Sequence, residues 1–218
     1  MKLALLNLKK RNNKSRLFAF GCSYTYGHGL KDCHEPPGYP GPCHSLFAWP
    51  SVVAETLGLE LSNQSHPGAS NKEIWNQILS NEITSKDTVI VLWTHLNRWC
   101  ILHKDKDLTP LGPWISNKIS KFYYKNIHDN FDNSIDFFVR ANHIYSLLKD
   151  QGVNQYHLMI KDINKLDVEI PWWNQINFLP IYLQQIRNRH PVALDGMHPG
   201  QNAHKDFALQ IVDYIKKI

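Results

Sequence analysis

The chain has 218 residues, 43% of them hydrophobic and 20% charged, which is enough to bury a core of its own. Its formal net charge is +5, and part of that charge lies in the first sixteen residues. Beyond that basic segment the sequence contains no nucleic-acid-binding module, and no apolar stretch approaches the roughly 18 residues that a membrane helix needs. Leu3–Leu8 is too short for a signal-peptide core. We therefore expect a soluble protein, cytoplasmic by default, with no nucleic-acid partner and no membrane span.

The predicted elements alternate between strands and helices. Strands are expected at 17–20, 59–61, 88–94 and 156–160, and helices at 50–57, 70–78, 135–148 and 201–217. Pro50 and Gly58 mark the two ends of the first helix, and Ser70 with Glu73 forms a capping box for the second. The β-branched apolar run 88–94 is typical of a strand covered on both faces. This order predicts βαβ units, with a mainly parallel sheet and helices on both sides.

The remaining segments are interpreted as an arm and as insertions in a single domain. Residues 1–16 form a basic N-terminal arm, and residues 17–218 form the domain, with insertions near 28–45, 103–130 and 171–180. The first insertion is rich in Gly, Pro, His and Cys, whereas the other two are polar and aromatic without a clean period. The sequence shows no internal repeat and no linker that would divide the chain.

A serine motif follows the first predicted strand directly. It reads Gly21-Cys22-Ser23-Tyr24-Thr25-Tyr26-Gly27. A serine at a sharp turn between strand and helix projects its hydroxyl from the carboxyl edge of the sheet, where ligands collect in open α/β sheets. Backbone N–H groups at the following helix start can stabilise an oxyanion. Alone, this motif is weakly specific, because glycines flank serines in many turns.

Three later segments place further polar groups at the same edge. Gly68, before the second helix, either offers an unobstructed N–H to a bound oxygen or is only a turn glycine. The polar segment His95-Leu96-Asn97-Arg98 follows the strand 88–94. Near the C-terminus, Asp195 precedes His198 by three residues, so that the carboxylate can orient the imidazole while its other nitrogen reaches a serine.

These blocks resemble the SGNH hydrolases, also called the GDSL-like family. The family has Gly-Asp-Ser-x-x-x-Gly, then a glycine, an asparagine, and Asp-x-x-His near the C-terminus. The matching residues are Gly21, Ser23 and Gly27 for the first block, Gly68 for the second, and Asp195 and His198 for the last. The matches span residues 17 to about 200. The resemblance implies a three-layer α/β/α sandwich with a mainly parallel, flavodoxin-like central sheet.

The resemblance also implies roles for these residues. Ser23 resembles the nucleophile and first oxyanion donor, and Gly68 resembles the second donor through its backbone N–H. His198 resembles the general base, oriented by Asp195. The implied activity is ester hydrolysis through an acyl-enzyme on Ser23, with no metal and no organic cofactor. The expected substrate is a small-molecule or carbohydrate ester, such as an O-acetyl or short acyl ester of a sugar. Aromatic residues of the insertions are expected to wall the crevice: Trp114, Tyr123, Tyr124, Trp172 and Trp173.

The sequence departs from the family pattern at two places. Cys22 stands where the family has Asp, and we interpret it as a buried structural thiol. In strict alignment His95 replaces the family's oxyanion asparagine, and Asn97 is the alternative donor. Arg98 either binds a substrate carboxylate or phosphate or forms a surface salt bridge.

Other interpretations stay open at this point. A non-catalytic carbohydrate-binding or structural, virion-type protein on the same scaffold is one alternative, and an acyltransferase is another. The insertion 28–45 holds residue types that bind zinc, although the paired Cys-x-x-Cys spacing is missing. These residues are His28, Cys33, His34, Cys43 and His44. Cys33 and Cys43 can also pair as a disulfide in an oxidising setting, but the preferred interpretation is a loop that borders the active site.

Overall fold

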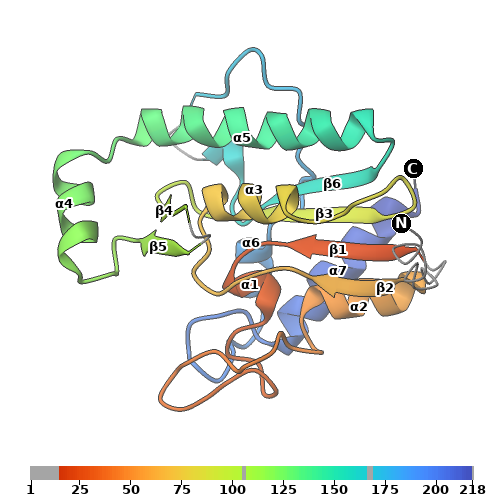
Figure 1. Cartoon of the computed structure of the whole chain (residues 1–218). Helices are drawn as coiled ribbons and strands as arrows, with labels where there is room; N and C mark the ends of the chain where they lie inside the picture. The colour runs from red at the N-terminus through yellow and green to blue at the C-terminus, as the bar shows by residue number, and fades with distance from the viewer. Residues whose placement is uncertain (1–14, 105–106, 166–168, 218) are drawn as a thin grey trace, which may run out of the picture.

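The computed structural model describes residues 15–104, 107–165 and 169–217 (Figure 1). Most of the predicted basic arm therefore lies outside the described residues. Arg16, the last residue of that arm, begins the first strand, and its guanidinium makes two 2.9 Å hydrogen bonds to the Asp87 carboxylate. In the part of the chain that is described, no helix combines the length and apolar character needed to cross a membrane.

Four strands form the central sheet in the order β2-β1-β3-β6, and every neighbouring pair is parallel. The central strands are β1 (Arg16–Phe20) and β3 (Thr88–Trp93), and the edge strands are β2 (Glu60–Asn63) and β6 (Asn154–Met159). All four predicted strands are thus confirmed, with small shifts at their ends. Because the strands are parallel, their carboxyl ends meet at one edge of the sheet.

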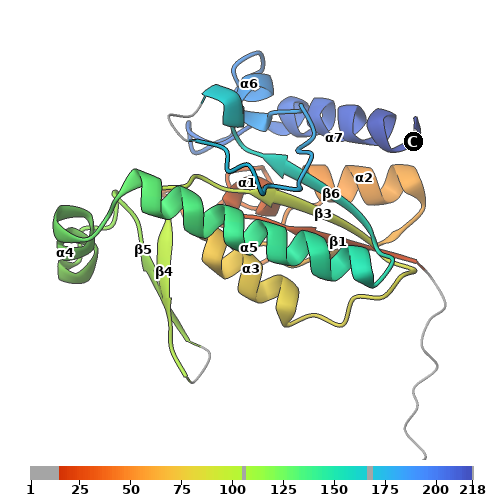
Figure 2. The ribbon, with the colours of Figure 1, turned by 90° about the horizontal axis from the view of Figure 1, so that it is seen from above.

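Helices cover both faces of this sheet (Figure 2). One face carries α2 (Trp49–Leu57) and α7 (Gln201–Ile215), which contact each other, and the short α6 (Leu183–Arg187) packs on α7. The other face carries α3 (Asn71–Leu79) and α5 (Asn130–Asp150), which also pack together. The predicted three-layer α/β/α sandwich with a flavodoxin-like sheet order is therefore confirmed.

Large aromatic side chains fill the space between the layers. Trp49 of α2 and Phe207 of α7 meet edge to face with ring centroids 5.7 Å apart, and Trp93 of β3 meets Phe137 of α5 in the same way at 5.6 Å. All four side chains are buried. Each pair joins elements that are distant in sequence, so this packing fixes the layers relative to one another.

Local signals placed two of these helices where the sequence predicted them. Pro50 lies in the first turn of α2, and Gly58 ends that helix with a φ of +66°, a conformation that glycine adopts without steric cost. The Ser70 side chain accepts a hydrogen bond from the Glu73 N–H and so caps α3. The Glu73 carboxylate does not complete the capping box, because it contacts the His66 ring at 3.1 Å instead.

The insertion predicted at 103–130, together with the four residues before it, contains regular structure that the sequence pattern did not show. The hairpin of β4 (Trp99–Leu102) and β5 (Leu108–Leu111) and the helix α4 (Lys118–Asn126) project from one end of the domain (Figures 1 and 2). The helix α5 also begins at Asn130, earlier than expected. By contrast, the segment 171–180 is irregular as predicted, and it follows a short 3-10 turn at Ile163–Lys165.

Candidate active site

Ser23 lies at the carboxyl edge of the sheet, at the start of the one-turn helix α1 (Ser23–Tyr26). The turn that places it requires Gly21, since a Cβ at that position would lie 2.0 Å from Oγ1 of Thr25 and 3.1 Å from the Leu92 carbonyl oxygen. Ser23 as a whole is only 4% exposed. Cys22, directly before it, is part of the hydrophobic core, as the interpretation of a buried thiol predicted.

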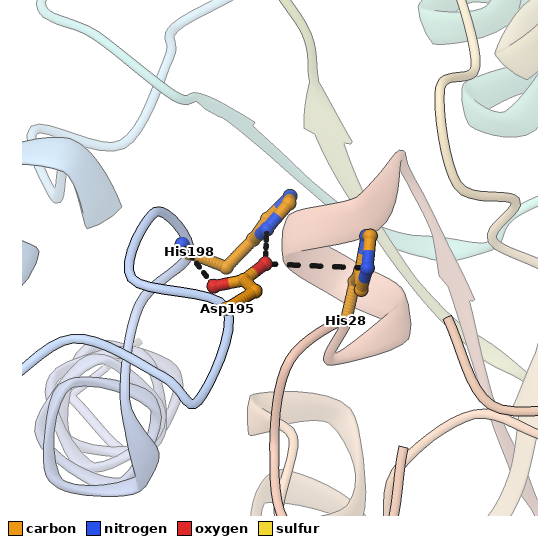
Figure 3. A group of neighbouring side chains, drawn as sticks. All are labelled: His28, Asp195 and His198. Carbon is orange, nitrogen blue, oxygen red and sulfur yellow. Dashed lines mark hydrogen bonds and ion pairs between the residues drawn. The ribbon is translucent and has the colours of Figure 1, made fainter. Parts of the chain in front are cut away.

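Asp195 and His198 come from the turn that precedes α7, and hydrogen bonds within the turn hold both side chains. Oδ1 of Asp195 accepts the backbone N–H groups of Met197 at 2.9 Å and of His198 at 3.0 Å. Oδ2 of the same carboxylate is hydrogen-bonded to Nδ1 of His198 (Figure 3). The carboxylate therefore fixes both the backbone of the turn and the orientation of the imidazole ring.

The two distant segments meet at a single hydrogen bond, because Nε2 of His198 lies 2.9 Å from Oγ of Ser23. Since Nδ1 faces the Asp195 carboxylate, that nitrogen carries the proton of the neutral ring. Nε2 is then the acceptor for the serine hydroxyl. The structure thus brings together the three residues that the sequence analysis singled out, in an order that allows a proton to move from Ser23 to His198.

The surroundings shift the pKa values of His198 and Asp195. Burial lowers the pKa of His198, and this effect outweighs the opposing influence of Asp195. Burial alone would raise the pKa of Asp195, but hydrogen bonds from the N–H groups of His198 and Met197, together with the His198 ring, hold it below its usual value. At neutral pH the site therefore contains a neutral imidazole beside an ionised carboxylate.

Two aromatic side chains that the sequence analysis did not assign to the site flank the His198 ring. The centroid of the His28 ring lies 4.4 Å away, and its Nε2 lies 3.0 Å from the Gly38 carbonyl oxygen and 4.0 Å from Oδ2 of Asp195 (Figure 3). The Tyr24 ring meets His198 edge to face at 5.5 Å. Tyr24 directly follows Ser23 in the sequence, and His28 comes shortly after it. This closeness to Ser23 is the sequence feature from which their place in the site could have been predicted.

The loop 28–45 packs directly against the turn that carries Asp195 and His198. The Gly29 carbonyl accepts the Leu194 N–H at 2.9 Å, and a Cβ on Gly29 would lie 2.8 Å from Cγ of Asp195. Cys33 and Cys43 are free thiols, so the disulfide alternative is wrong. The interpretation of this segment as a loop bordering the site agrees with these contacts.

His28, Asp195 and His198 also offer ligand atoms that lie within 4.8 Å of one another, so these three residues could hold a metal ion. The Asp195 and His198 atoms already bond to each other, and an ion there would compete with that hydrogen bond. The cysteine and histidine residues proposed as zinc ligands in loop 28–45 form no such group among the described residues, apart from His28.

Gly68 lies beside the Ser23 turn with a backbone conformation suited to glycine. Its φ is +84°, and nothing lies within 4 Å of the position where a Cβ would be. The loop is tied to the Ser23 turn by a 3.2 Å hydrogen bond from the His66 N–H to the Gly21 carbonyl. Within the described ranges the Gly68 N–H has no hydrogen-bond partner. It is therefore available to a bound oxygen.

The segment after β3 contributes side chains with different surroundings. Asn71 of α3 ties this segment to the Gly68 loop, because its Oδ1 accepts the Thr94 N–H at 2.8 Å and its Nδ2 donates to the Thr94 carbonyl at 3.2 Å. Burial, with smaller contributions from the charges of Arg98 and Lys161, lowers the pKa of His95 to about 4. His95 is therefore neutral near pH 7 and retains one N–H donor. Asn97 is exposed.

The aromatic residues of the insertions differ in their placement. Trp114 stacks on the Arg98 guanidinium, and the Tyr124 hydroxyl donates to the Asn97 carbonyl at 2.5 Å, so both adjoin the segment after β3. Trp173 instead packs against the core, and Trp172 is 95% exposed. Trp114 and Tyr124 thus adjoin this segment, and the expectation that the aromatic rings wall one crevice stays a prediction.

The chain was compared with family models, with curated protein sequences and with solved structures, and only the solved structures are similar to it. No family model and no curated protein sequence matches the chain. Among solved structures, a member of the lipolytic protein G-D-S-L family from Veillonella parvula is similar over 94% of this chain and 100% of its own, with 9% identity and a TM-score of 0.51. The esterase EstA from a Pseudoalteromonas species is similar over 93% and 97%, with 10% identity and a TM-score of 0.52.

An acetyl xylan esterase from Butyrivibrio proteoclasticus is similar over 93% of this chain, with 13% identity and a TM-score of 0.54. The chain spans 64% of the length of that enzyme. Likeness at these identities is a likeness of fold, and it agrees with the parallel sheet, its strand order and the two helical layers described above. The chain therefore has the fold of the SGNH hydrolases, also called the GDSL-like hydrolases.

Proposed function

We propose that the protein is a serine hydrolase that cleaves a carboxylic ester through an acyl-enzyme on Ser23. The observation that carries this proposal is the continuous chain of contacts from Oγ of Ser23 through the His198 ring to the Asp195 carboxylate. A serine hydroxyl is a weak nucleophile by itself and is activated when a neighbouring base accepts its proton. His198 is neutral and correctly oriented for that role.

The reaction follows from this geometry. Oγ of Ser23 attacks the ester carbonyl carbon as Nε2 of His198 takes the hydroxyl proton, and the Asp195 carboxylate stabilises the imidazolium. The tetrahedral intermediate collapses when His198 returns the proton to the leaving alcohol. A water molecule then gives a proton to His198 and attacks the acyl-enzyme, and His198 passes that proton to Oγ of Ser23 as the acyl group leaves. The products are a free acid and a regenerated Ser23.

The developing oxyanion is proposed to be held by backbone N–H groups of Ser23 and Gly68. The third donor of the family pattern is replaced, and we assign its place to the neutral His95 ring, because Asn97 is exposed. Loss of one such donor typically costs about 2.7–4 kcal/mol of transition-state stabilisation. An imperfect replacement by His95 would therefore give a slower enzyme rather than an inactive one.

The alcohol part of the substrate is proposed to be a carbohydrate. Aromatic faces bind sugar rings and acyl chains, and Trp114, which is 56% exposed, stands beside the segment after β3. The structural neighbours include an acetyl xylan esterase and a carbohydrate esterase of family 2, each with a TM-score of 0.54. These similarities favour an O-acetyl or short acyl ester of a glycan.

Hydrolysis assays with wild type, Ser23→Ala and Ser85→Ala test the proposal. Ser85 is an exposed serine in the turn before β3, at the opposite edge of the sheet, so it is a matched control. We expect wild type and Ser85→Ala to release acid from 4-nitrophenyl acetate and acetylated xylo-oligosaccharides, and Ser23→Ala to release none above background. Equal rates for Ser23→Ala and wild type would overturn the proposal. Transfer of the acetyl group to an added sugar in preference to water would instead identify an acyltransferase.

A further inference from the structure

Arg98 is a partly buried cation beside the candidate site for which the described residues supply no anionic partner. Its Nε and Nη1 atoms are buried and make no hydrogen bond. The carbon at the centre of the guanidinium lies 4.8 Å from the centroid of the Trp114 ring, so one face of the group is stacked. A buried guanidinium nitrogen without an acceptor is unfavourable, which makes this arrangement unusual for a purely structural arginine.

The backbone that carries Arg98 is fixed on both sides. The Arg98 N–H donates to the His95 carbonyl at 3.2 Å. The carbonyl of the preceding residue, Asn97, accepts from the Tyr124 hydroxyl at 2.5 Å, and that hydroxyl also lies 3.1 Å from the Leu111 carbonyl oxygen. The projecting insertion therefore holds Arg98 in place, unlike a freely rotating surface arginine.

The charge of Arg98 is close enough to act on the catalytic residues. Burial has the largest effect on the pKa of His198 and lowers it, while Asp195 raises it. The positive charge of Arg98 makes a smaller contribution, which lowers the pKa of His198. The same charge lowers the pKa of Tyr24. The only carboxylate in contact with His198 among the described residues is Asp195, which is already bonded to that ring and to the backbone of its own turn. It is therefore not a partner for Arg98.

Two further cations act on side chains of the same edge. Lys161, which follows β6, acts on His95, and Arg187 of α6 acts on Tyr24. The Arg187 Nε donates to the Met197 carbonyl at 2.8 Å, next to His198. Three cations, Arg98, Lys161 and Arg187, therefore act on this edge of the sheet beside the Asp195 carboxylate, and cationic groups favour an anionic ligand in both affinity and encounter rate.

We propose that Arg98 binds a carboxylate carried by the ester substrate, so that the enzyme prefers acidic esters, such as acylated sugar acids, to neutral ones. The planar guanidinium fork, stacked on Trp114 with two unpaired nitrogens, matches a planar carboxylate. This inference rests on the proposed esterase function. It makes Arg98 a specificity-determining residue, whereas Ser23 and His198 perform the chemistry.

Matched ester pairs test the inference. One pair is 3-acetoxybenzoate and its neutral methyl ester, which differ in the charge of the alcohol part. The other is 4-nitrophenyl hydrogen succinate and 4-nitrophenyl butyrate, which differ in the charge of the acyl part. For each pair the measured quantity is the ratio of kcat/KM for the anionic ester to that for the neutral ester. The variants are Arg98→Met and, as a control for net charge, Arg189→Met, which removes an exposed arginine.

We expect wild type and Arg189→Met to prefer the anionic member of at least one pair. In Arg98→Met that ratio should fall by about 10- to 100-fold, as expected for a lost hydrogen-bonded charge pair. A wild-type ratio without anionic preference in both pairs, or one that Arg98→Met leaves unchanged, would overturn the inference while the esterase proposal stands.

A second measurement does not depend on turnover. Ser23→Ala protein is titrated with 3-acetoxybenzoate and with its methyl ester, and binding is followed by the NMR resonance of the Arg98 Nε–H. We expect a shift that saturates with the anion only. If wild type hydrolyses none of the esters, the esterase proposal fails, and the titration still tests whether Arg98 binds a carboxylate. Equal responses to both compounds, or no response to either, would refute carboxylate binding by Arg98.

Discussion

Oγ of Ser23 lies 2.9 Å from Nε2 of His198, although the two residues are 175 positions apart in the sequence. The parallel sheet makes this contact possible, because the turn after β1 and the turn before α7 both lie at its carboxyl edge. The Gly29 and Leu194 backbones then join the two segments directly. The geometry of the site is therefore set by the fold and by a few backbone contacts, and each part of it can be tested separately.

Substitution within the proposed triad of Ser23, His198 and Asp195 should remove most of the activity without unfolding the protein. We expect Ser23→Ala and His198→Asn each to lower kcat/KM by about 10⁴-fold or more, since each removes the activated nucleophile. The double variant should be no worse than either single one, because the residues act as a unit. Steady-state kinetics with circular dichroism as a folding control would check this. Multiplicative losses in the double variant would contradict a shared step.

The acid limb of the pH profile should lie below the usual pKa of histidine. The base must be neutral, and burial lowers the pKa of His198, so kcat/KM should stay high as pH falls through about 6.5 and decline only below it. The His28 ring contributes to this lowering. His28→Phe should therefore move the acid limb to higher pH, in profiles of kcat/KM from pH 4 to 9. A midpoint above 6.5 in wild type would be inconsistent with a buried neutral base.

Gly68→Ala and Gly58→Ala form a matched pair that separates strain from catalysis. Both glycines have positive φ, and neither has an atom within 4 Å of the added Cβ. Each substitution should cost about 1–2 kcal/mol of unfolding free energy from backbone strain. Only Gly68→Ala should also lower kcat, by roughly 10²-fold, because it moves a proposed oxyanion donor. Similar kcat values for the two variants would remove Gly68 from the oxyanion site.

Asn71→Ala tests the link between the Gly68 loop and the end of β3. The Asn71 side chain satisfies both backbone groups of the buried Thr94, so its removal should lower the free energy of unfolding by about 1–3 kcal/mol. Asn76→Ala in the same helix is the control, since its side chain makes no such bond among the described residues. Its effect should stay within about 0.5 kcal/mol. Chemical denaturation would measure both, and equal effects would argue against the proposed link.

Much of the fold was accessible from the sequence because its local signals agree with its tertiary structure. The apolar run of β3 is buried in the sheet, and Pro50, Gly58 and Ser70 occupy the helix ends that their chemistry favours. The helix α4 was missed because it is only nine residues long, is mostly polar, and projects from the domain, where apolar side chains such as Phe122 are exposed.

The candidate site was only partly predictable for a different reason. Asp195 and His198 share one turn, so their spacing in the sequence predicts that their side chains meet. Ser23 could be identified because Gly21 and Gly27 flank it. The approach of His28 to the His198 ring depends on how the loop 28–45 folds back, and its cysteines and histidines suggested a metal site instead. Arg98 is partly buried with unpaired nitrogens because Trp114 stacks on it and the insertion runs beside it. No local sequence pattern predicts the path of that insertion.

Covalent labelling shows most directly whether Ser23 is an activated nucleophile, as we propose. Wild type, Ser23→Ala and Ser85→Ala are treated with a fluorophosphonate probe, and adducts are measured by intact-mass spectrometry and located by peptide mapping. We expect one adduct per chain, on Ser23, in wild type and Ser85→Ala, and none in Ser23→Ala. A folded wild-type protein that forms no adduct, or one labelled equally after Ser23→Ala, would contradict this proposal.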